Sequence, residues 1–220
     1  MKVTNEDNML MMQRIENETI DLLLTDPPFG MDFQSNYRKI KHEKIENDNN
    51  LNWFPDWIKE IKRIMKQDAH LYIFCSWHKV EVFKTEIEKY FNVKNILIWE
   101  KNNTGMGDLT GDFAPKYEMI IFCSNGVKKL KGNRDSNIIK AKKTGNEYHP
   151  TQKPVNLMEY LIEKSTNIND LVMDCFSGSG STAIAAYNTN RDFIGCEINK
   201  QFYDKAMERI NNHLAQQKLF

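Results

Sequence analysis

The sequence predicts an α/β protein with an open, mostly parallel sheet, and three observations favour this class. Short apolar runs alternate along the 220 residues with longer segments of helical periodicity. Most of these runs are continuously apolar, as in strands that are covered on both faces. A glycine-rich turn also joins one of the runs to a helix. Because the length suits one sizeable core and no segment marks a boundary, we expect residues 1–220 to form a single domain.

The apolar runs predict strands at residues 20–25, 70–75, 93–99, 117–123, 171–176 and 192–197. Helices are expected at residues 53–66, 79–90, 154–165, 181–188 and 201–217. In the first helix, Trp57, Ile58 and Ile61 recur at helical spacing with charged residues between them. No helix separates the third strand from the fourth, so we expect these two strands to form an antiparallel hairpin at one end of the sheet.

The composition is that of a globular protein in a reducing compartment. Thirty basic and 30 acidic residues give zero formal charge, and 40% of residues are hydrophobic, which argues against a disordered chain. No apolar run approaches the roughly 18 residues of a membrane span, and residues 1–10 lack the apolar core of a signal peptide. The four cysteines lie in apolar runs without zinc-like spacing. We therefore expect reduced thiols, no metal, no membrane association and a cytoplasmic location.

The segment LVMDCFSGSGSTAIAA is typical of a strand, a tight turn and a helix. Gly178 and Gly180 permit a sharp turn and close approach to a ligand, and Ala183 permits close packing of the helix on the strand. Glu197 ends the next strand, where a carboxylate can accept hydrogen bonds from ribose hydroxyls. The loop therefore predicts a cofactor that contains adenosine, either a dinucleotide or S-adenosylmethionine.

A second motif, TDPPFG, follows directly on the first predicted strand. The two prolines make the backbone stiff and extended, which fixes the Asp26 carboxylate and the neighbouring carbonyls at the carboxyl edge of the sheet. Ligands bind at that edge in open α/β sheets. Such acceptors suit an exocyclic amine, and Phe29 is placed to stack on a flat ring.

Together these motifs resemble those of the amino-group DNA methyltransferases. TDPPFG is similar to their catalytic pattern (D/N/S)PP(Y/F/W), and DCFSGSG is similar to their cofactor loop FxGxG. HPTQKP lies between the two, an order that resembles the β group of bacterial and phage enzymes. The resemblance covers nearly the whole chain. It implies a single-domain, Rossmann-like, S-adenosylmethionine-dependent fold with a permuted order of motifs.

The resemblance also implies roles for individual residues. The implied catalytic residues are Asp26, Pro27, Pro28 and Phe29. The implied cofactor-binding residues are Asp7, Asp26, Thr151, Lys153, Phe176, Gly178, Gly180, Thr182 and Glu197. Residues 125–148, which hold seven Lys or Arg residues, are expected to form a small basic target-recognition insertion. The DNA-binding residues expected there and after the catalytic motif are Lys128, Lys131, Arg134, Lys140, Lys142, Arg38 and Lys39.

The function implied is transfer of a methyl group from S-adenosylmethionine to the N6 amine of a flipped-out adenine in DNA. Transfer to the N4 amine of cytosine uses the same geometry and stays open, with Asp26 favouring adenine by resemblance. An NAD-dependent oxidoreductase would explain the glycine loop but not TDPPFG or HPTQKP, and an inactive DNA-binding subunit would not need an intact Asp26. By analogy with the β group, a homodimer is also expected. The chain does not indicate a recognition sequence or a cognate restriction enzyme.

Overall fold

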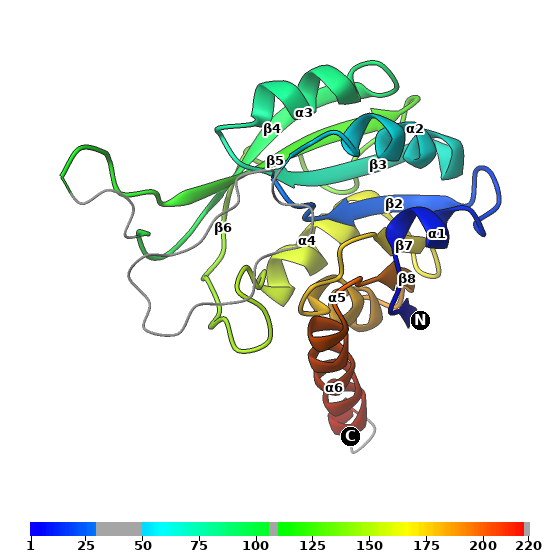
Figure 1. The fold of residues 1–220 in the computed structure, drawn as a ribbon. Helices are drawn as coiled ribbons and strands as arrows, with labels where there is room; N and C mark the ends of the chain where they lie inside the picture. Colours follow the sequence, from blue (N-terminus) through cyan, green and yellow to red (C-terminus); the bar gives the residue numbers. More distant parts are fainter. Residues whose placement is uncertain (30–49, 106–109, 218–220) are drawn as a thin grey trace.

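The computed structural model describes residues 1–29, 50–105 and 110–217, and within them the chain forms an eight-stranded sheet (Figure 1). The strands are β1 (Lys2–Thr4), β2 (Ile20–Thr25), β3 (Met65–Cys75), β4 (Asn92–Glu100), β5 (Tyr117–Asn125), β6 (Ile138–Lys140), β7 (Leu171–Asp174) and β8 (Asp192–Cys196). The helices are α1 (Asn8–Met12), α2 (Phe54–Ile64), α3 (Val80–Ile87), α4 (Val155–Ser165), α5 (Ser181–Asn188) and α6 (Lys200–Gln217).

All six predicted strands and all five predicted helices are confirmed; β2 and α5 have the predicted boundaries, and the boundaries of the other elements differ. The helix predicted to reach residue 66 ends at Ile64, because Met65 turns to an extended conformation and pairs with Ile20 of β2. The helix predicted over residues 79–90 is shorter and spans Val80–Ile87. The elements β1, α1 and β6 were not predicted, since three to five residues are too few to show a periodicity.

Strand directions follow the expected pattern of a mostly parallel sheet with a hairpin. The order is β1-β8-β7-β2-β3-β5-β4-β6, and β5 runs antiparallel to both β3 and β4. The other described pairs are parallel. The hairpin is not the outermost part of the sheet, because the short strand β6 adds to the free side of β4.

Helices cover both faces of the sheet, as continuously apolar strands require. In β2, Leu23 packs with residues of α1, α2 and α3, whereas Leu22 and Leu24 pack with residues of α4, α5 and α6 on the other face. Figure 1 shows α2 and α3 above β3, and α4, α5 and α6 below β2. No helix among the described residues is long and apolar enough to cross a membrane.

The topology marks one crevice at the carboxyl edge of the sheet. From β2 the chain crosses through α2 to β3, and from β7 it crosses through α5 to β8, so the two crossovers lead away from each other. Strands β2 and β7 are neighbours. The gap between their carboxyl ends is the switch point of the sheet, where open α/β folds bind ligands. Both sequence motifs begin there.

Candidate active site

Asp26 lies one residue beyond the end of β2, and only one of its two carboxylate oxygens contacts a polar group of another described residue. Its Oδ2 atom pairs with the Lys153 ammonium, whereas Oδ1 is buried and has no hydrogen-bond partner among the described residues. Burial raises the pKa of Asp26 to about 6, because Lys153 offsets only part of the desolvation. Near neutral pH the site thus offers an unused, charged acceptor.

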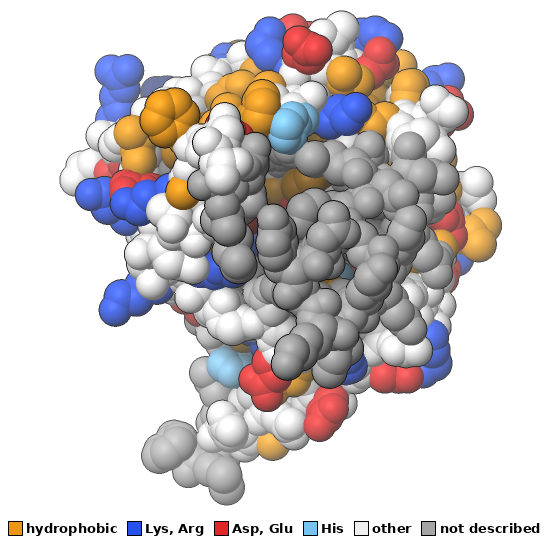
Figure 2. Space-filling view, turned by 60° about the vertical axis from the view of Figure 1, so that its left-hand side comes forward, with side chains coloured by type: hydrophobic (Ala, Val, Ile, Leu, Met, Phe, Trp, Pro, Cys, Tyr) orange, Lys and Arg blue, Asp and Glu red, His pale blue; other side chains and the backbone are white. Residues whose placement is uncertain are grey.

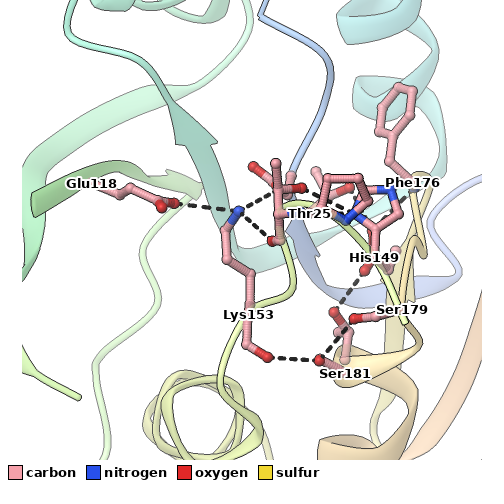
Figure 3. Close-up of polar contacts among 12 residues, drawn as sticks. Thr25, Glu118, His149, Lys153, Phe176, Ser179 and Ser181 are labelled. Atoms are coloured by element: carbon pink, nitrogen blue, oxygen red, sulfur yellow. Dashed lines mark hydrogen bonds and ion pairs between the residues drawn. The ribbon is translucent and has the colours of Figure 1, made fainter. Parts of the chain in front are cut away.

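Lys153 is the counter-ion of Asp26, a role that the sequence did not predict. Its side chain is only 6% exposed. The ammonium also lies 3.3 Å from Oε2 of Glu118, donates to the Thr151 carbonyl at 3.2 Å and sits 5.0 Å from the ring centre of Phe74. Figure 3 shows Lys153 extending from its backbone towards Glu118. Burial lowers the pKa of Lys153, but the two carboxylates outweigh this effect and raise it above its usual value.

The glycine turn has the sharp backbone turn that its sequence predicts. Gly178 and Gly180 adopt positive φ angles of 48° and 74°, a region that favours glycine. The Gly178 N–H donates to Oε2 of Glu197 at 2.9 Å, and the Asn199 N–H donates to Oε1 at 2.9 Å. Glu197 therefore fixes the turn through its side chain. Its position at the end of β8 is the one predicted for a ribose contact, which no contact in the structure tests.

Asp174 joins the two motifs and was not recognised as a site residue in the sequence. It is 3% exposed, and its Oδ1 accepts hydrogen bonds from the Thr25 hydroxyl at 2.7 Å and the Phe176 N–H at 3.1 Å. Its Oδ2 accepts from the Thr182 hydroxyl at 2.6 Å. Burial raises the pKa of Asp174, and these donors counteract the rise. The available signal was a single acidic residue within the apolar run directly before the glycine turn.

A second set of contacts ties the HPTQKP segment to the glycine turn. The Ser181 hydroxyl donates to the Lys153 carbonyl at 2.7 Å, and Arg209 of α6 donates to the Ser179 carbonyl and to Ser181, both at 2.9 Å. The His149 ring lies 3.5 Å from the position that a Cβ on Gly178 would take. Figure 3 shows His149 and Ser181 on the same side of the site. These contacts fix the backbone of the glycine turn relative to the backbone of the HPTQKP segment.

The remaining predicted residues surround the same edge of the sheet. Pro27 and Pro28 are buried, and the half-buried Phe29 ring lies 6.5 Å from that of Phe83. The half-buried Phe176 ring lies 5.5 Å from that of Trp53.

Two further predicted cofactor residues make local contacts. Asp7 follows β1 and caps α1, where its Oδ1 accepts from the Met9 N–H at 2.8 Å. Thr151 is exposed and its hydroxyl lies 3.1 Å from Nδ1 of His149. These contacts leave the predicted cofactor roles of both residues untested.

The predicted DNA-binding residues that the structure describes lie at two different edges of the sheet. Arg38 and Lys39 lie outside the described residues. Lys128 and Lys131 follow β5 towards the amino edge of the parallel strands: the Lys128 carbonyl lies 3.2 Å from Nε2 of His70, and the Lys131 ammonium donates at 2.9 Å to the carbonyl that follows α4. Lys128 and Lys131 therefore lie at the edge of the sheet opposite Asp26, and their predicted role in DNA binding stays a prediction.

Lys140 and Lys142 lie at the opposite edge of the sheet, where β2 ends before Asp26. Strand β6 runs parallel to β4, so the carboxyl end of β6 is on the same edge as Asp26. Lys140 is 81% exposed and lies 3.9 Å from Glu100. Arg134 is exposed and lies, in the sequence, between Lys131 and Lys140. In Figure 2 the coloured Lys and Arg side chains are interspersed with Asp and Glu, so they do not form a single cationic patch on that face.

Comparisons with known proteins agree with this geometry. A family model described as DNA methylase matches residues 20–208. The DNA adenine methyltransferase YhdJ of Escherichia coli (strain K12) is 25% identical over 258 residues, which cover 99% of this chain and 85% of that protein. The structure of an M1.HpyAVI–SAM complex shares 26% identity and a TM-score of 0.72, covering 94% of this chain and 98% of that one. The PvuII DNA methyltransferase (cytosine-N4-specific) has the same fold at 17% identity, with a TM-score of 0.74 over 96% of this chain and 90% of that one.

Proposed function

Since the chain belongs to the adenine-N6 and cytosine-N4 DNA methylase family, we propose that it transfers the methyl group of S-adenosylmethionine to the N6 amine of adenine in DNA. The observation that carries this proposal is the Oδ1 atom of Asp26, which has no hydrogen-bond partner among the described residues. A buried carboxylate oxygen without a partner is unfavourable unless a donor arrives. An exocyclic amine supplies such a donor.

The proposed chemistry asks Asp26 to stabilise a charge that forms on the amine. The lone pair of an aromatic amine is delocalised into the ring, so the nitrogen is a poor nucleophile. Asp26 Oδ1 accepts one N–H and the Pro27 carbonyl accepts the other, which favours a pyramidal nitrogen and stabilises its developing positive charge. Phe29 stacks on the base, which leaves the duplex at a cost of a few kcal/mol.

Several residues fit S-adenosylmethionine as the cofactor. S-adenosylmethionine supplies an electrophilic methyl group when bound. Gly178 and Gly180 adopt positive φ angles that other residues rarely adopt, and their lack of side chains lets a ligand approach the backbone closely. Glu197 ends β8 beside this turn as a candidate for the ribose, and Phe176 offers a half-buried ring for the adenine. Asp174 fixes the turn against β2. Binding of S-adenosylmethionine that is unaffected by NAD would separate this proposal from an oxidoreductase.

Adenine is favoured over cytosine on two grounds. Asp rather than Ser precedes Pro27-Pro28, which by resemblance is more typical of adenine enzymes. One relative that matches nearly the whole chain is named a DNA adenine methyltransferase. Cytosine N4 remains the second candidate because the same acceptors serve either amine.

The first experiment identifies the product and tests Asp26. Purified protein, unmethylated DNA and methyl-labelled S-adenosylmethionine are incubated, and the digested nucleosides are identified by mass. We expect N6-methyladenosine from the wild type, and a decrease in methyl transfer of about a hundredfold or more for Asp26→Ala. Cofactor affinity should stay within several-fold. The exposed Asp204→Ala serves as the control. N4-methylcytosine would overturn the target, and near-normal turnover of Asp26→Ala would overturn its role.

The DNA surface is proposed at the catalytic edge, with Lys142 as its test residue. Charge reversal by Lys142→Glu should weaken DNA binding. If Lys142 neutralises one phosphate, the slope of log affinity against log salt should become shallower by about one. Lys129→Glu makes the same change at an exposed position near the other edge and should alter binding little. Equal effects of the two substitutions would refute this placement.

A further inference from the structure

Glu118, at the start of β5, faces the ammonium of Lys153, which also pairs with Asp26 (Figure 3). Its Oε1 pairs with Lys101 at 2.7 Å, and its Oε2 lies 3.3 Å from Nζ of Lys153, without the alignment of a hydrogen bond. The Glu118 side chain is 26% exposed, so the pair is largely shielded from water. Two carboxylates and two ammonium groups therefore form one nearly neutral cluster.

We propose that Glu118 is a positioning residue for the methyl transfer proposed above. By sharing Lys153 with Asp26, it keeps the ammonium on one oxygen of that carboxylate and leaves the other, Oδ1, open to the target amine. The role requires no contact between Glu118 and the substrate. The ion pair with Lys101 fixes the position of the Glu118 carboxylate.

The distribution of charge around the Lys153 ammonium supports this role for Glu118. The ammonium of Lys153 donates towards Asp26 and to the Thr151 carbonyl, so its remaining face is the one turned to Glu118. Without Glu118, the full positive charge of Lys153 would oppose the positive charge that forms on the amine, and the ammonium would be drawn closer to Asp26. Both effects weaken Asp26 as an acceptor.

The groups that face Asp26 come from several elements. They are Lys153 ahead of α4, Glu118 on β5, Asp174 on β7 and Cys75 at the end of β3. Burial is the main cause of the raised pKa of Asp26, and the negative charges of Glu118 and Asp174 add to it. Removing the charge of Glu118 must therefore lower the pH at which Asp26 titrates.

The test compares Glu118→Gln with Glu100→Gln. Glu100 forms its own ion pair with Lys116 at 2.7 Å on the adjacent strand and does not contact Lys153. The titration of the Asp26 carboxyl carbon, followed by NMR with ¹³C-labelled aspartate and assigned by its loss in Asp26→Asn, should have its midpoint near pH 6 in the wild type. We expect Glu118→Gln to lower this midpoint by about half a pH unit or more, and Glu100→Gln to leave it unchanged.

Activity provides the second measurement. Above pH 8, Glu118→Gln should lower kcat about tenfold, as for other residues that orient a functional group from outside the site. Affinity for S-adenosylmethionine, measured by calorimetry, should change less than twofold. A variant that loses activity equally at every pH, with the Asp26 midpoint unmoved, would show a merely structural role and overturn the proposal.

A second variant and the titration itself keep the proposal testable if Glu118→Gln does not fold or the wild type is inactive. If Glu118→Gln does not fold, Glu118→Asp moves the carboxylate away from Lys153 by one methylene, and a smaller downward shift of the Asp26 midpoint is expected. An unchanged midpoint would again overturn the proposal. If the wild type transfers no methyl group, the proposed function fails, but the titration still shows whether Glu118 controls Asp26.

Discussion

Replacing Lys153 by methionine should both destabilise the fold and raise the pH at which Asp26 titrates. Methionine keeps an unbranched, flexible side chain of similar length, so the substitution removes mainly the charge. Asp26 and Glu118 then share a largely buried site without the ammonium that lies between them. Because Lys153 lowers the pKa of Asp26, which burial has raised to about 6, its loss must move that pKa further upward.

The size of the effect follows from burial. Removing one partner of a buried ion pair typically costs 3–5 kcal/mol. The Asp26 side chain is 17% exposed and that of Glu118 is 26% exposed, so the lower end applies and we expect a loss of about 3 kcal/mol at pH 8. Protonation of Asp26 relieves the unpaired charge. The loss should therefore be smaller at pH 5, below the raised pKa, than at pH 8, above it.

Urea unfolding at pH 5 and pH 8 measures both effects. The m-value should stay constant, which shows that the same surface is exposed on unfolding. Lys116→Met removes an exposed lysine from its pair with Glu100 and should cost far less at either pH. If Lys153→Met were as stable as the wild type at pH 8, or lost the same free energy at both pH values, the assigned ion pair would be wrong.

Two further predictions concern stability at positions away from Asp26. Burial lowers the pKa of His70 to about 4, so as pH falls the unfolded chain takes up a proton that the folded chain excludes. His70 should thus remove up to about 3 kcal/mol of stability between pH 7 and pH 4, and His70→Gln should lose less over this range in urea titrations. An added Cβ at Gly195 would lie 2.6 Å from the Ser177 hydroxyl and 2.7 Å from the Asp174 carbonyl oxygen. Gly195→Ala should therefore cost about 2 kcal/mol or more, whereas Gly145→Ala, with nothing within 4 Å, should change the unfolding midpoint little.

The main elements of this fold could be predicted from the sequence because their signals are local. Continuous apolar runs identify covered strands, and the 18-residue helix at the end of the chain repeats its apolar face several times. The β1 strand has no such signal. It exists because Thr4 pairs with Cys196 of β8, at the far end of the chain. Only the folded sheet brings these two residues together.

The site residues likewise divide into those that a local sequence signal predicts and those that only the folded chain brings together. Gly178 and Gly180 were predictable because a tight turn restricts residue type at fixed spacing. The pairing of Lys153 with Asp26 was not, because the two residues are 127 positions apart and a lysine in a polar segment gives no sign of burial. The lysines of the basic segment are close in sequence, but β5 and β6 carry them to different edges of the sheet, which their spacing does not indicate.

The raised pKa of Asp26 shows how stability and the proposed function oppose each other at this site. Relative to its usual value of 3.8, a pKa of about 6 means that the folded protein resists ionising this carboxyl. The cost of keeping it charged above pH 6 is about 3 kcal/mol, and it is incurred progressively as pH rises from 4 to 6. A hydrogen bond to Oδ1 from the protein would reduce that cost. It would also occupy the oxygen that the proposed amine substrate requires, which gives a physical reason why the counter-ion Lys153 pairs with only one oxygen of Asp26.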